Sequence, residues 1–148
     1  MSHLKGFPDL PPVWALGVWL AQQAGARWLP LAAFDAGWIG GALVAGGLAL
    51  ILWAAIWFRR KRTPIEPHHR PKALIVEGPY RINRNPIYTG LAIILVGTGL
   101  NAGALSALLL AAAFPIIATR RFAIPEEAGL RAAFGAEADR YIAATRRW

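Results

Sequence analysis

Two long stretches of the chain carry no charged residue. The first, residues 36–58, reads AGWIGGALVAGGLALILWAAIWF and lies between Asp35 and Arg59. A helix that crosses the hydrocarbon core of a bilayer needs about 20 apolar residues, so this stretch is long enough for one membrane span. Trp38 near one end and Trp57 near the other suit the interfacial position that tryptophan prefers. We therefore predict a spanning helix over residues 36–58.

The second uncharged stretch, residues 86–119, is too long for a single span. It is interrupted at 99–103, where two glycines and an asparagine form a break. We predict a helical hairpin here, with spans over 86–100 and 104–119. Pro115 should kink the second of these helices, because proline lacks the N–H that would bond to the preceding turn.

A shorter apolar segment precedes these stretches. Pro11-Pro12 is typical of a helix start, and Gln22 and Arg27 interrupt the apolar run that follows. A cleaved signal peptide fits this segment poorly, since the residues before it hold a single lysine. We predict a tilted first span over residues 13–33 that packs against the others.

These elements predict the fold class: an all-α integral membrane protein with about four transmembrane helices. The chain is long enough for one domain over residues 1–148, with a cytoplasmic loop at 63–85 and a tail at 120–148. The tail should include an amphipathic helix, because apolar side chains recur in it at near-helical spacing, namely Leu130, Phe134, Ala138 and Tyr141.

Composition supports the membrane class. Of the 148 residues, 56% are hydrophobic and 16% are charged, whereas a soluble domain has about 25% charged residues. The chain has no cysteine, which excludes disulfides, thiolate metal sites and a cysteine nucleophile. Its formal net charge of +8 would also suit a nucleic-acid-binding protein. The positions of the charged residues along the chain decide between a membrane protein and a nucleic-acid-binding protein.

Almost all basic residues follow either the second or the fourth predicted span. By the positive-inside rule both termini then lie in the cytoplasm, and we predict a location in the bacterial inner membrane. The charge excess is explained by topology and predicts no nucleic-acid partner. The residues are Arg59, Arg60, Lys61, Arg62, Arg70, Lys72, Arg81 and Arg84 after the second span, and Arg120, Arg121, Arg131, Arg140, Arg146 and Arg147 after the fourth.

Two segments on this side carry candidate chemistry. Asn85-Pro86 predicts a capped helix start whose positive dipole end could bind an anion such as a carboxylate. An interfacial loop with aromatic anchors is an equal alternative for that segment. After the fourth span, Pro125 predicts another helix start, and a carboxylate in its first turn either stabilises the helix dipole or grips a polar ligand. In the second interpretation Glu126 would accept hydrogen bonds from ribose hydroxyls or an ammonium group, and a nearby arginine would hold an anionic acceptor.

Four short motifs on this side resemble one known family. They are Gly-Pro-Tyr at 78–80, Arg-Asn-Pro-Ile-Tyr-Thr-Gly at 84–90, Glu-Glu-x-x-Leu at 126–130 and Phe-Gly at 134–135. Their combination resembles the isoprenylcysteine carboxyl methyltransferase family and, with it, bacterial membrane methyltransferases that act on phospholipids and thiols.

The resemblance implies the cofactor S-adenosyl-L-methionine, held between the loop before the third span and the glutamates after the fourth. It also implies that an arginine just before the glutamate pair, Arg121 or Arg120, binds the substrate. The implied cofactor-binding residues are Lys72, Ala73, Leu74, Ile75, Tyr80, Asn85, Pro86, Ile87, Tyr88, Glu126 and Glu127.

The expected acceptor is a lipophilic small molecule or a lipid-modified group in the membrane, with the carboxylate of an isoprenylcysteine-like substrate favoured. The isoprenylcysteine enzymes usually have histidine where this chain has Asn85, and asparagine cannot act as a base at neutral pH. A carboxylate acceptor needs no base. A phospholipid amine, a small thiol, or a non-enzymatic subunit that binds anionic lipid or protein are the alternatives. The sequence does not predict the oligomeric state.

Other motifs are interpreted structurally. His68-His69 lacks a third ligand and is expected to be a loop pair, so we predict no metal site. Gly97-x-Gly99 lies in an apolar helix and Gly46-Gly47 in another, and both are expected to serve helix packing.

Overall fold

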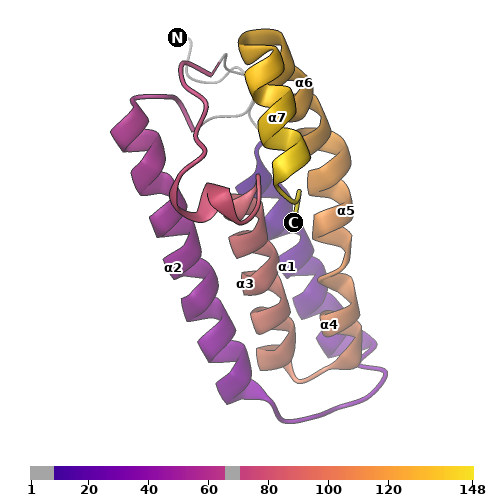
Figure 1. Cartoon of the computed structure of the whole chain (residues 1–148). Coiled ribbons are helices and arrows are strands. Elements are labelled where there is room, and N and C mark those ends of the chain that lie inside the picture. Colours follow the sequence, from indigo (N-terminus) through magenta and orange to yellow (C-terminus); the bar gives the residue numbers. More distant parts are fainter. Residues whose placement is uncertain (1–8, 66–70) are drawn as a thin grey trace, which may run out of the picture.

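The computed structural model describes residues 9–65 and 71–148, and over those residues the chain is helical with no strand (Figure 1). Two isolated bridges pair Ala33 with Ala104 and Asn83 with Arg146. The predicted histidine pair lies outside the described residues. The helices are α1 (Pro11–Trp28), α2 (Gly37–Lys61), the 3-10 helix η1 (Gly78–Arg81), α3 (Pro86–Ala102), α4 (Leu105–Leu110), α5 (Ala113–Ala118), the π-helix η2 (Thr119–Ala123), α6 (Ile124–Phe134) and α7 (Ala136–Ala144).

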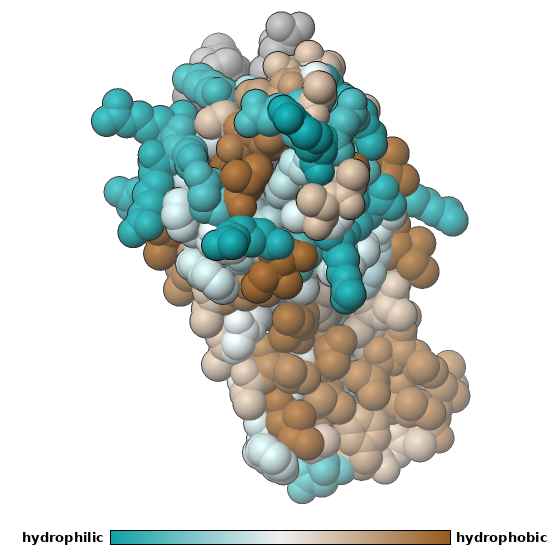
Figure 2. Space-filling model, in the orientation of Figure 1, coloured by the Kyte–Doolittle hydropathy of each residue, from teal (hydrophilic) through white to brown (hydrophobic). Residues whose placement is uncertain are grey.

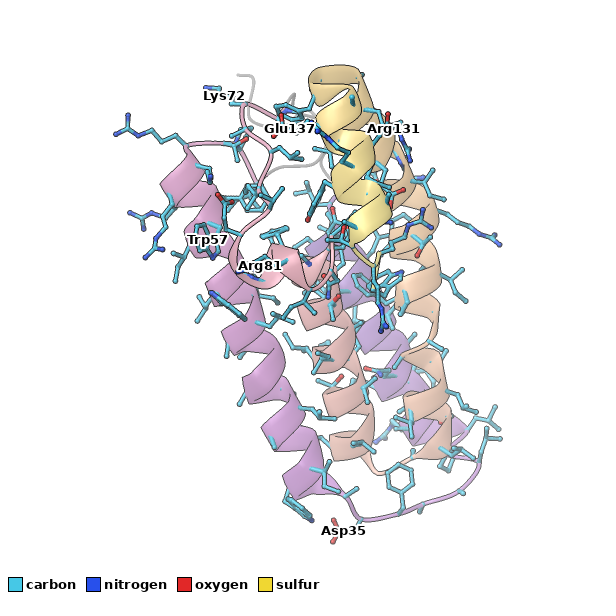
Figure 3. The ribbon with its side chains drawn as sticks, in the orientation of Figure 1. Asp35, Trp57, Lys72, Arg81, Arg131 and Glu137 are labelled. Carbon is cyan, nitrogen blue, oxygen red and sulfur yellow. The ribbon has the colours of Figure 1, made fainter. Side chains whose placement is uncertain are left out.

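The longer helices run side by side as a bundle. α3 contacts α1, α2, α4 and α5, while η1 and α6–α7 lie at one end of the bundle. That end is hydrophilic and the visible face of the other half is mostly apolar (Figure 2). Lys72, Arg81, Arg131 and Glu137 lie at or toward the hydrophilic end, whereas Asp35 lies at the opposite end (Figure 3). The structure therefore gathers charged residues from the loop and the tail at one end of the bundle, as the sequence predicts (Figures 2 and 3).

Two helical runs are long and apolar enough to cross a membrane. They are Gly37–Lys61, which matches the span predicted over 36–58, and Leu105–Phe134, which comprises α4, α5, η2 and α6. α3 is apolar but shorter. The length and composition of these two runs support membrane association. The four spans and the hairpin remain predictions.

α2 and α3 pack with their backbones in contact. Gly40 and Gly47 of α2 face Gly97 and Gly90 of α3. A Cβ placed at Gly47 would lie 2.6 Å from the Gly90 carbonyl oxygen, and one at Gly97 would lie 2.6 Å from that of Gly40. Glycine permits this approach, which is typical of packed helices in membranes. Of the predicted pair at 46–47, only the second residue packs, since a Cβ at Gly46 would meet nothing within 4 Å.

α1 is held to the bundle by a buried amide. Gln22 is fully buried, and its Nε2 donates to the carbonyl oxygens of Leu95 (2.7 Å) and Ala107 (2.9 Å). The Thr98 hydroxyl donates to Oε1 of the same side chain at 2.8 Å. α1 ends at Trp28 rather than continuing through residue 33, because Pro30 disfavours helical backbone in the residue before it.

Two prolines shape the run from α4 to α6. Pro115 cannot donate to Ala111, and the α-helix is interrupted at 111–112, one turn before the proline that was predicted to kink it. Phe114 donates to the Ala111 carbonyl instead, at 3.3 Å. Pro125 lies in the first turn of α6, together with Glu126 and Glu127, as predicted, although α6 continues directly from the helix before it. The chain is already helical there, and the wider π-helix η2 accommodates its ring, with the Ile124 N–H bonded to Thr119.

The tail forms two helices rather than one amphipathic helix. Gly135, with φ 53° and ψ −128°, breaks the helix between α6 and α7. Of the predicted apolar stripe, Ala138 and Tyr141 on α7 are buried, while Leu130 and Phe134 on α6 are half-buried.

Replacing Gly47 tests the backbone contact between α2 and α3. Gly47→Ala is expected to destabilise the protein by about 1–3 kcal/mol, because the new methyl group would overlap α3. Gly46→Ala is the matched control and should keep or raise stability, since alanine favours helix by about 1 kcal/mol over glycine. Thermal unfolding in detergent measures both, and equal melting temperatures would contradict the contact.

Candidate functional site

The start of α3 lies at the hydrophilic end of the bundle. Asn85 occupies the N-cap position and Pro86 the first turn, as predicted. The predicted side-chain cap is wrong, because Asn85 has φ −127° and ψ 55° rather than the extended backbone usual for a cap. Its side-chain amide donates instead to the Arg147 carbonyl oxygen at 3.0 Å, and its N–H donates to the Asn83 side chain at 3.0 Å. The helix start is thereby joined to the end of the chain.

Tyr88 and Glu126 meet across the bundle although 38 residues separate them. Tyr88 lies in the first turn of α3, is buried, and donates its hydroxyl hydrogen to the Glu126 carboxylate on α6. Its ring also packs at a tilt on Phe122, with 6.1 Å between the ring centroids. Among the described residues Glu126 has no cationic partner. The Glu126 carboxylate is therefore bonded to a tyrosine that itself packs on a second aromatic ring, and no cation of the described residues pairs with it.

Tyr80 lies beside this pair. It is buried in η1, meets the Phe58 ring edge-on at 5.8 Å, and accepts a hydrogen bond at its carbonyl from the Tyr141 hydroxyl at 2.8 Å. Burial raises the pKa of Tyr80 well above its ordinary value, and the nearby Tyr141 and Glu126 raise it further. Burial likewise raises the pKa of Tyr141 to about 12. Both phenols are therefore neutral hydrogen-bond donors at physiological pH.

The loop before η1 turns partly inward. Ile75 is buried in a cluster with Ala54 of α2, and Leu74 packs against that cluster. Ala73 is half-buried, whereas Lys72 is exposed, and the Lys72 N–H donates to the Thr63 hydroxyl at 3.0 Å. Of the four loop residues predicted to contact a cofactor, Leu74 and Ile75 thus lie nearest to the core.

Pro86 and Ile87 complete the predicted set at the helix start. Pro86 is fully buried, and Ile87 packs against both the Ile75 cluster and the core cluster that contains Tyr88. Both residues therefore join the loop to the bundle.

Gly78 and Glu77 fasten the loop to α2. Gly78 has φ 59°, and a Cβ there would lie 1.9 Å from Nε1 of Trp57, so only glycine fits. Glu77 forms an ion pair with Lys61 at the end of α2, and the hydrogen bond from Lys61 lowers the pKa of that carboxyl.

The two arginines predicted to bind substrate are exposed in η2. Arg121 forms an ion pair with Asp9, and its guanidinium lies over the Trp14 ring at 5.3 Å. Arg120 contacts no described carboxylate. The structure joins neither arginine to the pair formed by Tyr88 and Glu126.

Two other arginines bind Glu127, the second residue of the glutamate pair. Glu127 is buried and accepts hydrogen bonds from Arg84 at 3.0 Å and from Arg147 at 2.7 and 2.8 Å. The hydrogen bond to Glu127 raises the pKa of Arg147. The charge pattern of the sequence explains Arg84 and Arg147 as basic residues after a span and predicts no contact with Glu127 for either. The one feature of the sequence that could have indicated this contact is that Arg84 is the single basic residue in the motif at 84–90.

The described residues hold no group of three or more histidine, aspartate or glutamate side chains that could bind a metal ion. The site itself offers a carboxylate, neutral phenols, aromatic faces and the amides at a helix start.

A family model described as phospholipid methyltransferase matches residues 36–137. The match extends from the start of α2 into α7 and includes Tyr80, Tyr88 and Glu126. No curated protein and no solved structure matches the chain.

Replacing Tyr141 tests how α7 is attached. Tyr141→Phe keeps the ring in its cluster but removes the hydrogen bond to the Tyr80 carbonyl. We expect a loss of about 1 kcal/mol in stability, measured by thermal unfolding in detergent. Arg140→Ala, at the exposed neighbouring position, is the control and should unfold like the wild type. An unchanged melting temperature for Tyr141→Phe would argue against this attachment.

Proposed function

Because the chain belongs to the phospholipid methyltransferase family, we propose that it is an integral membrane enzyme that transfers a methyl group from S-adenosylmethionine to a membrane-associated acceptor. The observation that carries the proposal is the hydrogen bond between Tyr88 and Glu126. It joins the two motifs in which the resemblance implies cofactor contacts, and Tyr80 lies beside it.

The residues at this site fit the cofactor by their chemistry. The Glu126 carboxylate can accept hydrogen bonds from ribose hydroxyls or from an ammonium group. Tyr80, Tyr88 and Phe122 offer aromatic faces, which attract cations such as a sulfonium. The first backbone amides of α3 have no acceptor within the helix and suit a carboxylate. We propose that these groups hold the cofactor, with Leu74, Ile75, Asn85 and Ile87 around them.

When bound, the cofactor would supply an electrophilic methyl group. The protein would then act by holding the acceptor in line with that methyl and by excluding water, effects that can be worth several kcal/mol. A carboxylate acceptor is already ionised at pH 7 and needs no general base. An arginine would hold it, and Arg120 is the better of the two predicted candidates because Arg121 is paired with Asp9.

A lateral cavity supports a lipophilic acceptor. It has a volume of about 330 Å³ and is lined by apolar side chains of α2, α3, α4 and α5, including Leu43 and Pro115. Thr89, the residue after Tyr88, also lines it. We therefore favour an acceptor that carries a hydrocarbon chain, with the carboxylate of an isoprenylcysteine-like lipid as its reactive group.

A phospholipid amine is the second candidate, and the description of the matching family favours it. An amine must lose a proton before it can be methylated. Glu126 has no cationic partner among the described residues, so it could accept that proton.

The proposed orientation follows from the charges. Lys72, Arg81 and Arg131 lie at or toward the end of the bundle that carries the loop and α6–α7. We propose that this end faces the cytoplasm of a bacterial inner membrane, where the cofactor would enter.

Calorimetry of S-adenosylmethionine with the detergent-purified protein tests the site. The wild type should bind saturably, and Glu126→Gln should bind at least about ten-fold more weakly, because a charge-assisted hydrogen bond is lost. Tyr88→Phe should also bind more weakly, since it removes the partner that orients the carboxylate. Glu137→Gln changes an exposed carboxylate on α7 and should bind like the wild type.

Absence of binding by a well-folded wild type would refute the enzyme proposal and favour a non-enzymatic subunit that binds lipid or protein. If binding is found, incubating membrane extracts with methyl-labelled cofactor distinguishes the acceptors. Label released as methanol by mild base indicates a methyl ester, and base-stable label in phospholipid indicates an amine.

A further inference from the structure

Neighbouring glutamates at 126 and 127 have different partners. Glu126 accepts a hydrogen bond from Tyr88 alone among the described residues. Both carboxylate oxygens of Glu127 are bound by arginines: Oε1 accepts from Arg84 and Arg147, and Oε2 accepts from Arg147 at 2.8 Å. The Glu127 side chain is 8% exposed and the Arg84 side chain 9% exposed. Glu127 thus has little capacity left for a ligand.

Arg84 extends this contact to the end of α7. Its guanidinium donates to the carbonyl oxygen of Ile142 at 2.8 Å and to that of Thr145. Its backbone N–H donates to the Arg146 carbonyl oxygen at 2.8 Å. One side chain therefore links the segment before α3, the first turn of α6 and the residues after α7.

The link constrains the direction of the neighbouring carboxylate. Successive residues on a helix point about 100° apart. Fixing Glu127 against Arg84 and Arg147 therefore fixes the rotation of α6, and this rotation directs Glu126 toward Tyr88. Loss of either arginine would leave a buried charge under-compensated and would release α6 or the segment after α7.

We infer that Glu127 is a positioning residue rather than a cofactor ligand: held by Arg84 and Arg147, it orients α6 so that Glu126 meets Tyr88. The resemblance implied that both glutamates bind the cofactor, and the contacts instead divide their roles. The inference rests on the proposed function, since it concerns the same site.

A double-mutant cycle in cofactor affinity tests the inference. Glu127→Gln and Arg84→Gln are each expected to weaken S-adenosylmethionine binding about ten-fold by calorimetry, and the double variant should bind no more weakly than the worse single variant. Hydrogen exchange without cofactor should show faster exchange for residues 141–148 in both single variants. Arg131→Gln removes the exposed ion pair between Arg131 and Asp139, also between α6 and α7, and should change neither measurement.

A direct contact between Glu127 and the cofactor predicts a different pattern. Arg84→Gln would then leave the affinity at the wild-type value, or the two losses would add, and either result overturns the inference while the wild type still binds. Unchanged hydrogen exchange would overturn it as well. If the wild type does not bind, the proposed function fails and the inference fails with it. Should Arg84→Gln not fold, Arg147→Gln removes the more exposed arginine and is expected to give the same pattern.

Discussion

The Glu127 carboxylate joins three parts of the chain that lie far apart in sequence: the segment before α3, the start of α6 and the residues after α7. A buried ion pair adds little net stability over apolar packing, because both charges lose their water. Removing one partner nevertheless costs about 3–5 kcal/mol. The pairing with Arg84 and Arg147 therefore adds little to the stability of the fold, but it disfavours other placements of α6. Any placement of α6 that separated Glu127 from its arginines would bury an unpaired charge, and the contact between Tyr88 and Glu126 depends on that placement.

Different interactions hold the apolar half of the bundle together: close backbone contacts and a buried side-chain amide. On the proposed placement of this half in a bilayer, the lipid is as apolar as the helices, so close van der Waals packing and buried hydrogen bonds would replace the hydrophobic effect as the force between them. Backbone contact at Gly47 and Gly90 fixes α3 against α2, and Gln22 fixes α1 against α3 and α4. α3 takes part in both systems. Its apolar length is positioned by glycine and amide contacts, and its first turn enters the polar site in an orientation set by the rest of the bundle.

The features predicted from the sequence are those that depend on local pattern. Residues 36–58 were predicted as a helix because an uncharged stretch between Asp35 and Arg59 has few alternatives, and α2 matches it closely. The tail was predicted as one helix, because apolar spacing does not reveal that Gly135 takes positive φ. Tyr88 and Glu126 were singled out by resemblance, and the structure brings them together. The role of Arg84 depends on a partner 43 residues away, which no local pattern specifies.

Adjacent residues at the start of α3 border two different environments. The Tyr88 hydroxyl reaches Glu126 at the polar site, whereas Thr89 lines the lateral apolar cavity. The Thr89 hydroxyl is also held by the chain, since it donates to the Asn85 carbonyl oxygen at 3.0 Å and accepts from the Asn83 side chain at 3.2 Å. Two consecutive residues in the first turn of α3 therefore face different surroundings: Tyr88 faces the carboxylate of the polar site, and Thr89 faces the apolar cavity. On the proposed function, a lipid whose chain occupied the cavity would present its polar end at this turn. The rigid position of α3 would then supply the alignment that methyl transfer requires.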